Sequence, residues 1–213
     1  MTEADALALI RETRSLVFTT REFSALANIS ITFASQMLRR LAAKKRILRI
    51  YQGLWADSQN PLFNAYKVIP FLARPHPAAV SLLSALHLHG MIEQIPQVIY
   101  VVSTAPTRKV RTPVGDYSIH QIAPEFFVGY DYYRQEGGFL IAAPEKALVD
   151  CLYLSARKGR RFIALPELTL PKAFRRGLAL SYIKKIPYKN LRKAVEKRYA
   201  ALSRLQRLRQ GKK

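Results

Sequence analysis

Polar and basic side chains recur between residues 30 and 52, and they are of the types that bind nucleic acid. Glutamine recognises adenine, and arginine recognises guanine, through paired hydrogen bonds in the major groove of DNA. Nearby lysine and arginine side chains can hold phosphates, which positions a protein on DNA without specifying a sequence. The residue types therefore predict a surface that reads duplex DNA through Ser30, Thr32, Phe33, Ser35, Gln36, Arg39, Arg40, Lys44, Lys45, Arg46, Arg49 and Gln52.

A helix followed by a tight hairpin is needed to present these side chains together. Ser30 is a good N-cap, because its hydroxyl can accept a hydrogen bond from a free backbone N–H at the start of a helix. Apolar residues then recur at three- and four-residue steps, which predicts one buried stripe made of Ala34, Met37, Leu38 and Leu41. The periodicity changes after Arg46, where two short apolar runs around Gln52 and Gly53 predict a β-hairpin.

An ordinary solvated helix is the alternative for this basic stretch. From Arg39 to Arg49 the sequence holds six basic residues and no acidic residue. A solvated helix usually mixes charge signs, because opposite charges four residues apart stabilise it. The absence of acidic residues in this stretch favours DNA binding. For Phe33 two roles stay open: contact with a thymine methyl group, or packing in the core.

The segments before this stretch complete a recognisable order of elements. Two shorter helices are predicted over residues 2–14 and 21–27, with Thr20 as the cap of the second and an apolar run at residues 16–18 between them. Helix, helix, turn, helix and hairpin in this order are typical of a winged helix-turn-helix. We therefore expect residues 1–60 to form a winged helix-turn-helix DNA-binding domain.

Beyond residue 60 the sequence predicts a second domain of mixed type. Three prolines argue against one continuous helix over residues 61–75, which we expect to be a connector. Residues 76–213 alternate helical and β-branched patterns, so the predicted fold class is α+β, with the winged helix followed by a mixed α/β domain and a basic C-terminal helix. We expect strands over residues 97–103 and 139–143, a turn leading into a strand over residues 112–120, and helices over residues 78–89, from residue 144, over 172–185 and over 189–209.

The charge of the chain also indicates a nucleic-acid partner. With 35 basic and 14 acidic residues, the net charge is +21, an excess that attracts polyanions. Residues 184–213 alone hold twelve basic residues and one acidic residue, a net charge of +11. We expect the helix over residues 189–209 to add auxiliary nucleic-acid contacts through Lys193, Lys197, Arg204 and Arg207.

Motifs for catalysis and metal binding are absent from the sequence. His87 and His89 lie two apart in a predicted helix, so their side chains point about 200° apart and cannot share a metal. A single cysteine makes no zinc ligand set, and no glycine-rich phosphate motif occurs. Glu145 and Asp150 suggest a nuclease-like site, but we expect Glu145 to start a helix and Asp150 to pair with a base such as Lys146. No metal, cofactor or enzymatic activity is expected.

The compartment is suggested by three features. No stretch approaches the uninterrupted apolar length of a membrane span, and the N-terminus lacks the pattern of a signal peptide. Cys151 has no second cysteine with which to form an internal disulfide, which suits a reducing cytosol. We expect a cytoplasmic protein with no membrane partner.

Several segments in order resemble a known family. They are residues 51–56 (YQGLWA), 81–90 (SLLSALHLHG), 98–104 (VIYVVST), 115–120 (GDYSIH) and 141–150 (IAAPEKALVD), of which residues 144–150 are the most specific. The chain resembles the AbiEi family, the antitoxins and transcriptional regulators of type IV toxin–antitoxin systems. The resemblance covers most of the chain.

The resemblance implies two roles. The N-terminal domain would bind repeats in its own promoter and repress the operon. The C-terminal domain would antagonise a nucleotidyltransferase-type toxin, without needing direct contact with it. The alternatives are a stand-alone transcriptional regulator, an RNA-associated binding protein and, less favoured, a nuclease.

Overall fold

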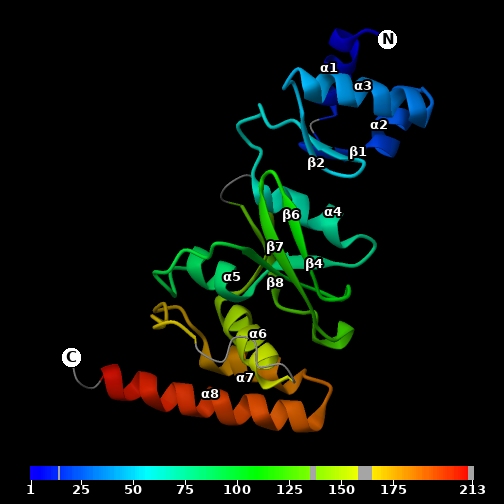
Figure 1. Ribbon diagram of the computed structural model, residues 1–213. Helices are drawn as coiled ribbons and strands as arrows, with labels where there is room; N and C mark the ends of the chain where they lie inside the picture. Colours follow the sequence, from blue (N-terminus) through cyan, green and yellow to red (C-terminus); the bar gives the residue numbers. More distant parts are fainter. Residues whose placement is uncertain (14, 135–137, 158–164, 211–213) are drawn as a thin grey trace.

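The protein is described by a computed structural model covering residues 1–13, 15–134, 138–157 and 165–210 (Figure 1). It is an α+β protein with two separate sheets, of three and six strands. The N-terminal unit holds the smaller sheet, and its elements are α1 (Glu3–Glu12), β1 (Val17–Thr19), α2 (Thr20–Leu26), α3 (Ile31–Ala43), β2 (Leu48–Tyr51) and β3 (Leu54–Ala56). This order matches the elements predicted for residues 1–60, with an added strand, β1, in the predicted apolar run.

Side-chain caps determine where these helices begin. Ser30 caps α3 as predicted, with its hydroxyl accepting a hydrogen bond of 3.2 Å from the backbone N–H of Phe33. The cap of α2 is Thr19, so the prediction of Thr20 was wrong by one residue. Thr19 and Glu22 exchange side-chain and backbone hydrogen bonds, a reciprocal arrangement that satisfies two N–H groups at the start of the helix.

The three-stranded sheet is buried on both faces, and it joins the two units. Its order is β1-β3-β2, and both pairings are antiparallel. On one face, Phe18 and Trp55 pack with the buried side chains of α1 and α3. On the other face, Val17, Leu54 and Ala56 belong to the core of the second unit. The sheet therefore has helices of its own unit on one side and the second unit on the other.

The segment after residue 60 contributes to that shared core. It forms a 3₁₀ turn (Ala65–Val68) and the short helix α4 (Ile69–Ala73). Val68, Ile69, Leu72 and Ala73 are buried in the same cluster as Leu54. The segment predicted as a connector thus contains short ordered pieces, as expected, and α4 packs between the two sheets.

The second unit is built on a six-stranded mixed sheet with the order β6-β7-β5-β4-β9-β8. The pairs β4–β9 and β5–β7 are parallel, and the other pairs are antiparallel. Helices α6, α7 and α8 stack on one another beyond the sheet, at the end of the molecule farthest from α3 (Figure 1). The elements are β4 (Ala78–Val80), α5 (Leu82–Leu88), β5 (Ile99–Ser103), β6 (Arg108–Thr112), β7 (Gly115–Gln121), a 3₁₀ turn (Pro124–Phe126), β8 (Tyr130–Tyr133), β9 (Phe139–Ala142), α6 (Pro144–Ala156), α7 (Arg176–Lys184) and α8 (Lys189–Gln210).

Two predictions for this unit need correction. The helix expected over residues 78–89 starts only at Leu82, because Ala78–Val80 is a strand between β5 and β9. Strands β6 and β8 were missed, and both lie at the edges of the sheet. The predicted strands near residues 97–103, 112–120 and 139–143, and the helices from residue 144 and near residues 172–185 and 189–209, are confirmed with small shifts of their ends.

A buried ion pair ties α6 to two strand ends. The Lys146 ammonium donates a hydrogen bond to Oδ1 of Asp150, and both side chains are fully buried. Oδ2 of Asp150 also accepts hydrogen bonds from the hydroxyls of Ser81 at 2.7 Å and Tyr130 at 3.2 Å. The ammonium lies 3.2 Å from the centroid of the Phe126 ring, within the range of a cation–π contact. The prediction that Asp150 pairs with Lys146 is confirmed.

Burial opposes the charged forms of both partners. It lowers the pKa of Lys146 to about 8, against the attraction of Asp150. It raises the pKa of Asp150, although Lys146 and the two hydroxyls favour the carboxylate. Each charge therefore depends on the other, and removal of one leaves a buried charge without its counter-ion.

We predict that Lys146→Met lowers the free energy of unfolding by about 3–5 kcal/mol at pH 7, because Asp150 is left buried without a cation. The pKa of Asp150 should then rise further above its unfolded value. The folded variant holds a proton that the unfolded chain has lost, so its stability deficit should shrink as pH falls from 7 towards 5. Urea titrations at several pH values measure both effects.

The double variant Lys146→Met, Asp150→Asn is the matched control. A neutral amide oxygen can still accept hydrogen bonds from Ser81 and Tyr130, so much of the lost stability should return. A deficit that is independent of pH, with no recovery in the double variant, would contradict the role given to the ion pair.

Candidate nucleic-acid interface

The predicted reading face of α3 is open to solvent. Thr32, Phe33, Gln36, Arg39 and Arg40 are exposed, and Ser35 is partly buried. The opposite face carries the predicted apolar stripe, which is fully buried at Ala34, Met37, Leu38 and Leu41. Phe33 is 41% exposed, so the alternative that it is a core residue is wrong.

A groove runs between α3 and the β2–β3 hairpin. It brings together four of the predicted contact residues, Ser35 and Arg39 from α3 and Arg49 and Gln52 from the hairpin. The guanidinium of Arg49 lies 5.9 Å from the centroid of the Trp55 ring, which holds this cation on the groove wall. The groove can therefore present cations and amides to one ligand from two different elements.

Six further lining residues of the groove were not predicted as contacts, and among them are Arg21 and Ile31. Arg21 lies in the first turn of α2, where the helix dipole disfavours a cation. This placement could have indicated a contact residue from the sequence, because a cation at the start of a helix becomes favourable when it binds an external anion. Ile31 is 54% exposed at the start of α3, and nothing in the apolar pattern distinguished it from a core residue.

The hairpin is held in place by bonds to the start of α2. The backbone N–H of Thr20 donates to the carbonyl of Gly53 at 2.9 Å, and the indole N–H of Trp55 donates to the Thr20 hydroxyl at 2.9 Å. Gly53 has a φ of +69°, a left-handed conformation that favours glycine at this turn. The position of Gln52 at the tip is thus fixed relative to α2 and α3.

The three cations that follow α3, Lys44, Lys45 and Arg46, lie outside the α3–hairpin groove. Lys44 forms an ion pair of 2.9 Å with Glu3 of α1. Lys45 has a φ of +55° and its carbonyl accepts a hydrogen bond from Gln59, so it ends the helix. Lys44, Lys45 and Arg46 are all exposed, but the lining of the α3–hairpin groove does not include them.

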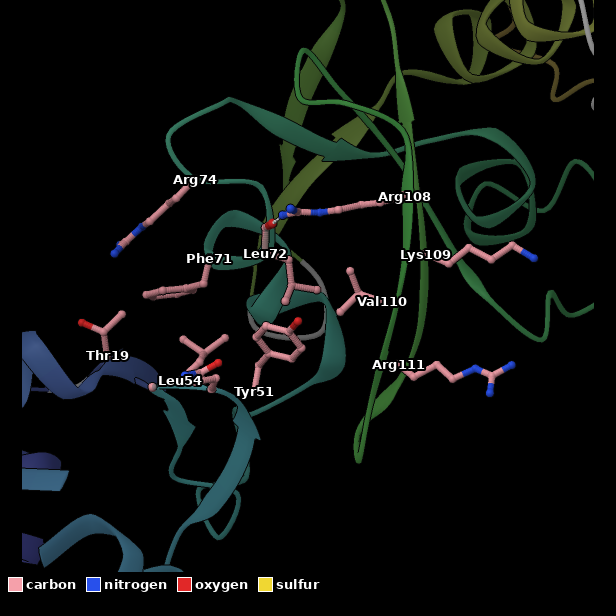
Figure 2. A pocket seen from close by; sticks show the side chains of 12 residues that line it. Thr19, Tyr51, Leu54, Phe71, Leu72, Arg74, Arg108, Lys109, Val110 and Arg111 are labelled. Carbon is pink, nitrogen blue, oxygen red and sulfur yellow. Dashed lines mark hydrogen bonds between the residues drawn. The ribbon is translucent and has the colours of Figure 1, made fainter. Parts of the chain in front are cut away.

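A second groove lies between the hairpin and the second unit (Figure 2). Its lining shares Thr19, Gln52 and Gly53 with the first groove, so the two meet at the hairpin tip. On the far wall, the guanidinium of Arg74 lies 4.2 Å from the Phe71 ring centroid and pairs with Glu22 at 3.0 Å. Further basic side chains come from edge strand β6: Arg108 bonds to the carbonyl of Leu72, whereas Figure 2 shows Lys109 and Arg111 pointing away from the hairpin.

The predicted auxiliary contacts on α8 are not brought near α3. Lys193, Lys197 and Arg204 are exposed, and the side chain of Arg207 lies outside the described residues. Figure 1 shows α8 and α3 at opposite ends of the molecule, with the six-stranded sheet and α6 between them. The two sets of cations therefore form separate surfaces.

Metal binding and membrane insertion have no candidate elements in the described parts of the chain. There, no three His, Cys, Asp or Glu side chains gather closely enough to ligate a metal ion. No helix in the same residues has both the length and the apolar composition to cross a bilayer. Cys151 is fully buried, and burial raises the pKa of its thiol well above the ordinary value.

Comparison with known proteins did not identify a family. No protein-family model matches this chain, and no curated protein matches it. The candidate function therefore depends on the geometry of the α3 surface and the neighbouring hairpin.

Proposed function

We propose that the protein is a transcriptional repressor that reads duplex DNA with a winged helix-turn-helix unit formed by residues 1–60. The observation that carries this proposal is the exposed face of α3, with Gln36, Arg39 and Arg40 open to solvent above a fully buried apolar stripe. The neighbouring hairpin adds Arg49 and a fixed tip, as the wing of such a unit would.

In this proposal α3 enters the major groove. Gln36 would recognise adenine, and Arg39 or Arg40 would recognise guanine, each through paired hydrogen bonds. Arg49 and Gln52, with Arg21 at the start of α2, would hold the flanking phosphates from the other side of the groove. Exposed Phe33 is free to meet a thymine methyl group.

We further propose that the repressor acts as the antitoxin of a type IV toxin–antitoxin operon, against a nucleotidyltransferase-type toxin that it need not touch. The support is the resemblance to the AbiEi family, whose most specific segment is residues 144–150. In the structure this segment supplies the buried Lys146–Asp150 pair that ties α6 to the sheet. The most specific part of the resemblance therefore lies in residues that build the second unit.

The same burial speaks against a nuclease. Glu145 is only 2% exposed and accepts a hydrogen bond of 2.6 Å from the backbone N–H of Arg175. Asp150 is fully enclosed by its own partners. Carboxylates in these positions cannot hold a metal ion against a nucleic acid at the surface, which supports the proposal of a non-enzymatic protein.

For the reading helix, we predict that Arg39→Ala with Arg40→Ala abolishes the preference for the native promoter fragment over random duplex. A base contact contributes about 1–3 kcal/mol of discrimination at its own base pair. Gel-shift titrations measure the ratio of the two affinities. The control Arg11→Ala with Lys172→Ala removes the same charge from exposed sites outside the grooves and should keep the ratio. An unchanged ratio in the Arg39, Arg40 variant would refute the reader assignment.

For the hairpin, we predict a different result. Arg49→Ala should weaken binding to promoter and random duplex alike, and it should reduce the salt slope of log affinity by about 0.9, because one phosphate contact is lost. Affinities measured between 50 and 200 mM salt give this slope. A change in sequence preference with no change in slope would show that Arg49 contacts a base.

For the antitoxin role, the neighbouring reading frame supplies the test. We predict that a nucleotidyltransferase gene lies beside this one, that its expression alone arrests growth, and that co-expression of this protein restores growth. Arrest that persists despite co-expression would leave a regulator without antitoxin activity. Tighter binding to structured RNA than to promoter duplex of equal length would favour the RNA-associated alternative.

A further inference from the structure

A row of cations runs along the outer face of α8. Lys189, Lys193 and Lys197 follow one another at four-residue steps, Arg204 continues the same row, and all four side chains are exposed. The opposite face of the helix is occupied, because Val195 and Tyr199 are buried in the core of the second unit. We call these four side chains the α8 row.

The spacing of the α8 row suits a polyanion of regular geometry. Fifteen residues of helix separate its ends, about 22 Å at the usual rise, with a cation about every 6 Å over its first half. One strand of duplex DNA has a phosphate about every 3.4 Å along the axis, so the row faces roughly six phosphate steps. Like charges four residues apart destabilise a helix, and Glu196 at the edge of the row is the one acidic residue of α8.

Other polyanionic surfaces fit the α8 row less well. A membrane-bound amphipathic helix inserts its apolar face into the lipid, but here that face is covered by the second unit. Single-strand binders stack successive bases on aromatic side chains. The α8 row contains no aromatic residue. The exposed Tyr188 lies just before the first residue of the row.

We propose that the α8 row binds the phosphate backbone of a second DNA duplex, so that one molecule holds two DNA segments. Figure 1 places α8 at the opposite end of the protein from α3, beyond the six-stranded sheet and α6. A short duplex seated on α3 therefore cannot also lie along α8. This inference rests on the proposed reading of DNA by α3, and it assigns the auxiliary contacts predicted for α8 to a different duplex from the one on α3.

The test is a capture assay with two duplexes. A short operator duplex is immobilised and loaded with the full-length protein, and a labelled random duplex is added in solution. The wild-type protein should retain the labelled duplex. Lys193→Ala with Lys197→Ala should reduce this capture and lower its salt slope by about two, because two phosphate contacts are lost. Arg11→Ala with Lys172→Ala removes the same charge elsewhere and should capture as the wild type does.

Three other outcomes would overturn the inference. If wild-type protein binds the operator but retains no labelled duplex, α8 does not bridge DNA. If Lys193→Ala with Lys197→Ala weakens binding to the short operator as much as it weakens capture, the row belongs to the first footprint. If structured RNA displaces the labelled duplex at far lower concentration than DNA does, the row serves RNA. Failure of wild-type protein to bind the operator at all would instead refute the proposed function.

Discussion

The structure depends on a small sheet that has no free face. A three-stranded sheet with one solvated side could move with its own unit, but here both sides are buried. Phe18 and Trp55 contact the helices of the N-terminal unit, while Leu54 and Ala56 lie in the core of the second unit. Because packed interiors deform little, the hairpin is fixed relative to both α3 and the six-stranded sheet. The Arg74–Glu22 pair adds a polar contact across the same junction.

The second unit carries a costly interaction of a different kind. A buried ion pair gives up the hydration of two charges, and well-packed apolar side chains often replace it without loss of stability. Here the Asp150 carboxylate joins Lys146 of its own helix to Ser81 at the end of β4 and to Tyr130 of β8. The pair and its two hydroxyl partners thus connect α6 to β4 and β8.

Local signals in the sequence were sufficient to predict α3 and the hairpin that follows it. The Ser30 cap, the apolar stripe and the change of period after Arg46 each act within a few residues, and the structure keeps all three. The helix prediction was wrong at Ala78–Val80 because two alanines of high helical propensity and a valine are held as a strand between β5 and β9, which only the tertiary fold requires. Strand β6 was missed because its sequence, RKVRT, is mostly charged, as edge strands often are. Ile31 could not be assigned to the groove without knowing which elements meet, whereas Arg21 carried a local signal in its place at the start of α2.

The net charge of +21 is a property of the whole chain, whereas binding depends on where the exposed cations lie on the surface. At physiological salt, exposed charges act over about 8 Å, and a sheet with a packed layer beside it is already about 10 Å thick. Cations on α3 and on α8 are separated by more than one such layer, so they attract polyanions independently. On α3 the cations lie beside amide and hydroxyl groups that can distinguish bases, whereas the α8 row consists of cations alone. In the proposed function, α3 at one end of the molecule would select a sequence and the α8 row at the other end would hold a backbone of any sequence, with the packed junction between the units setting the distance between them.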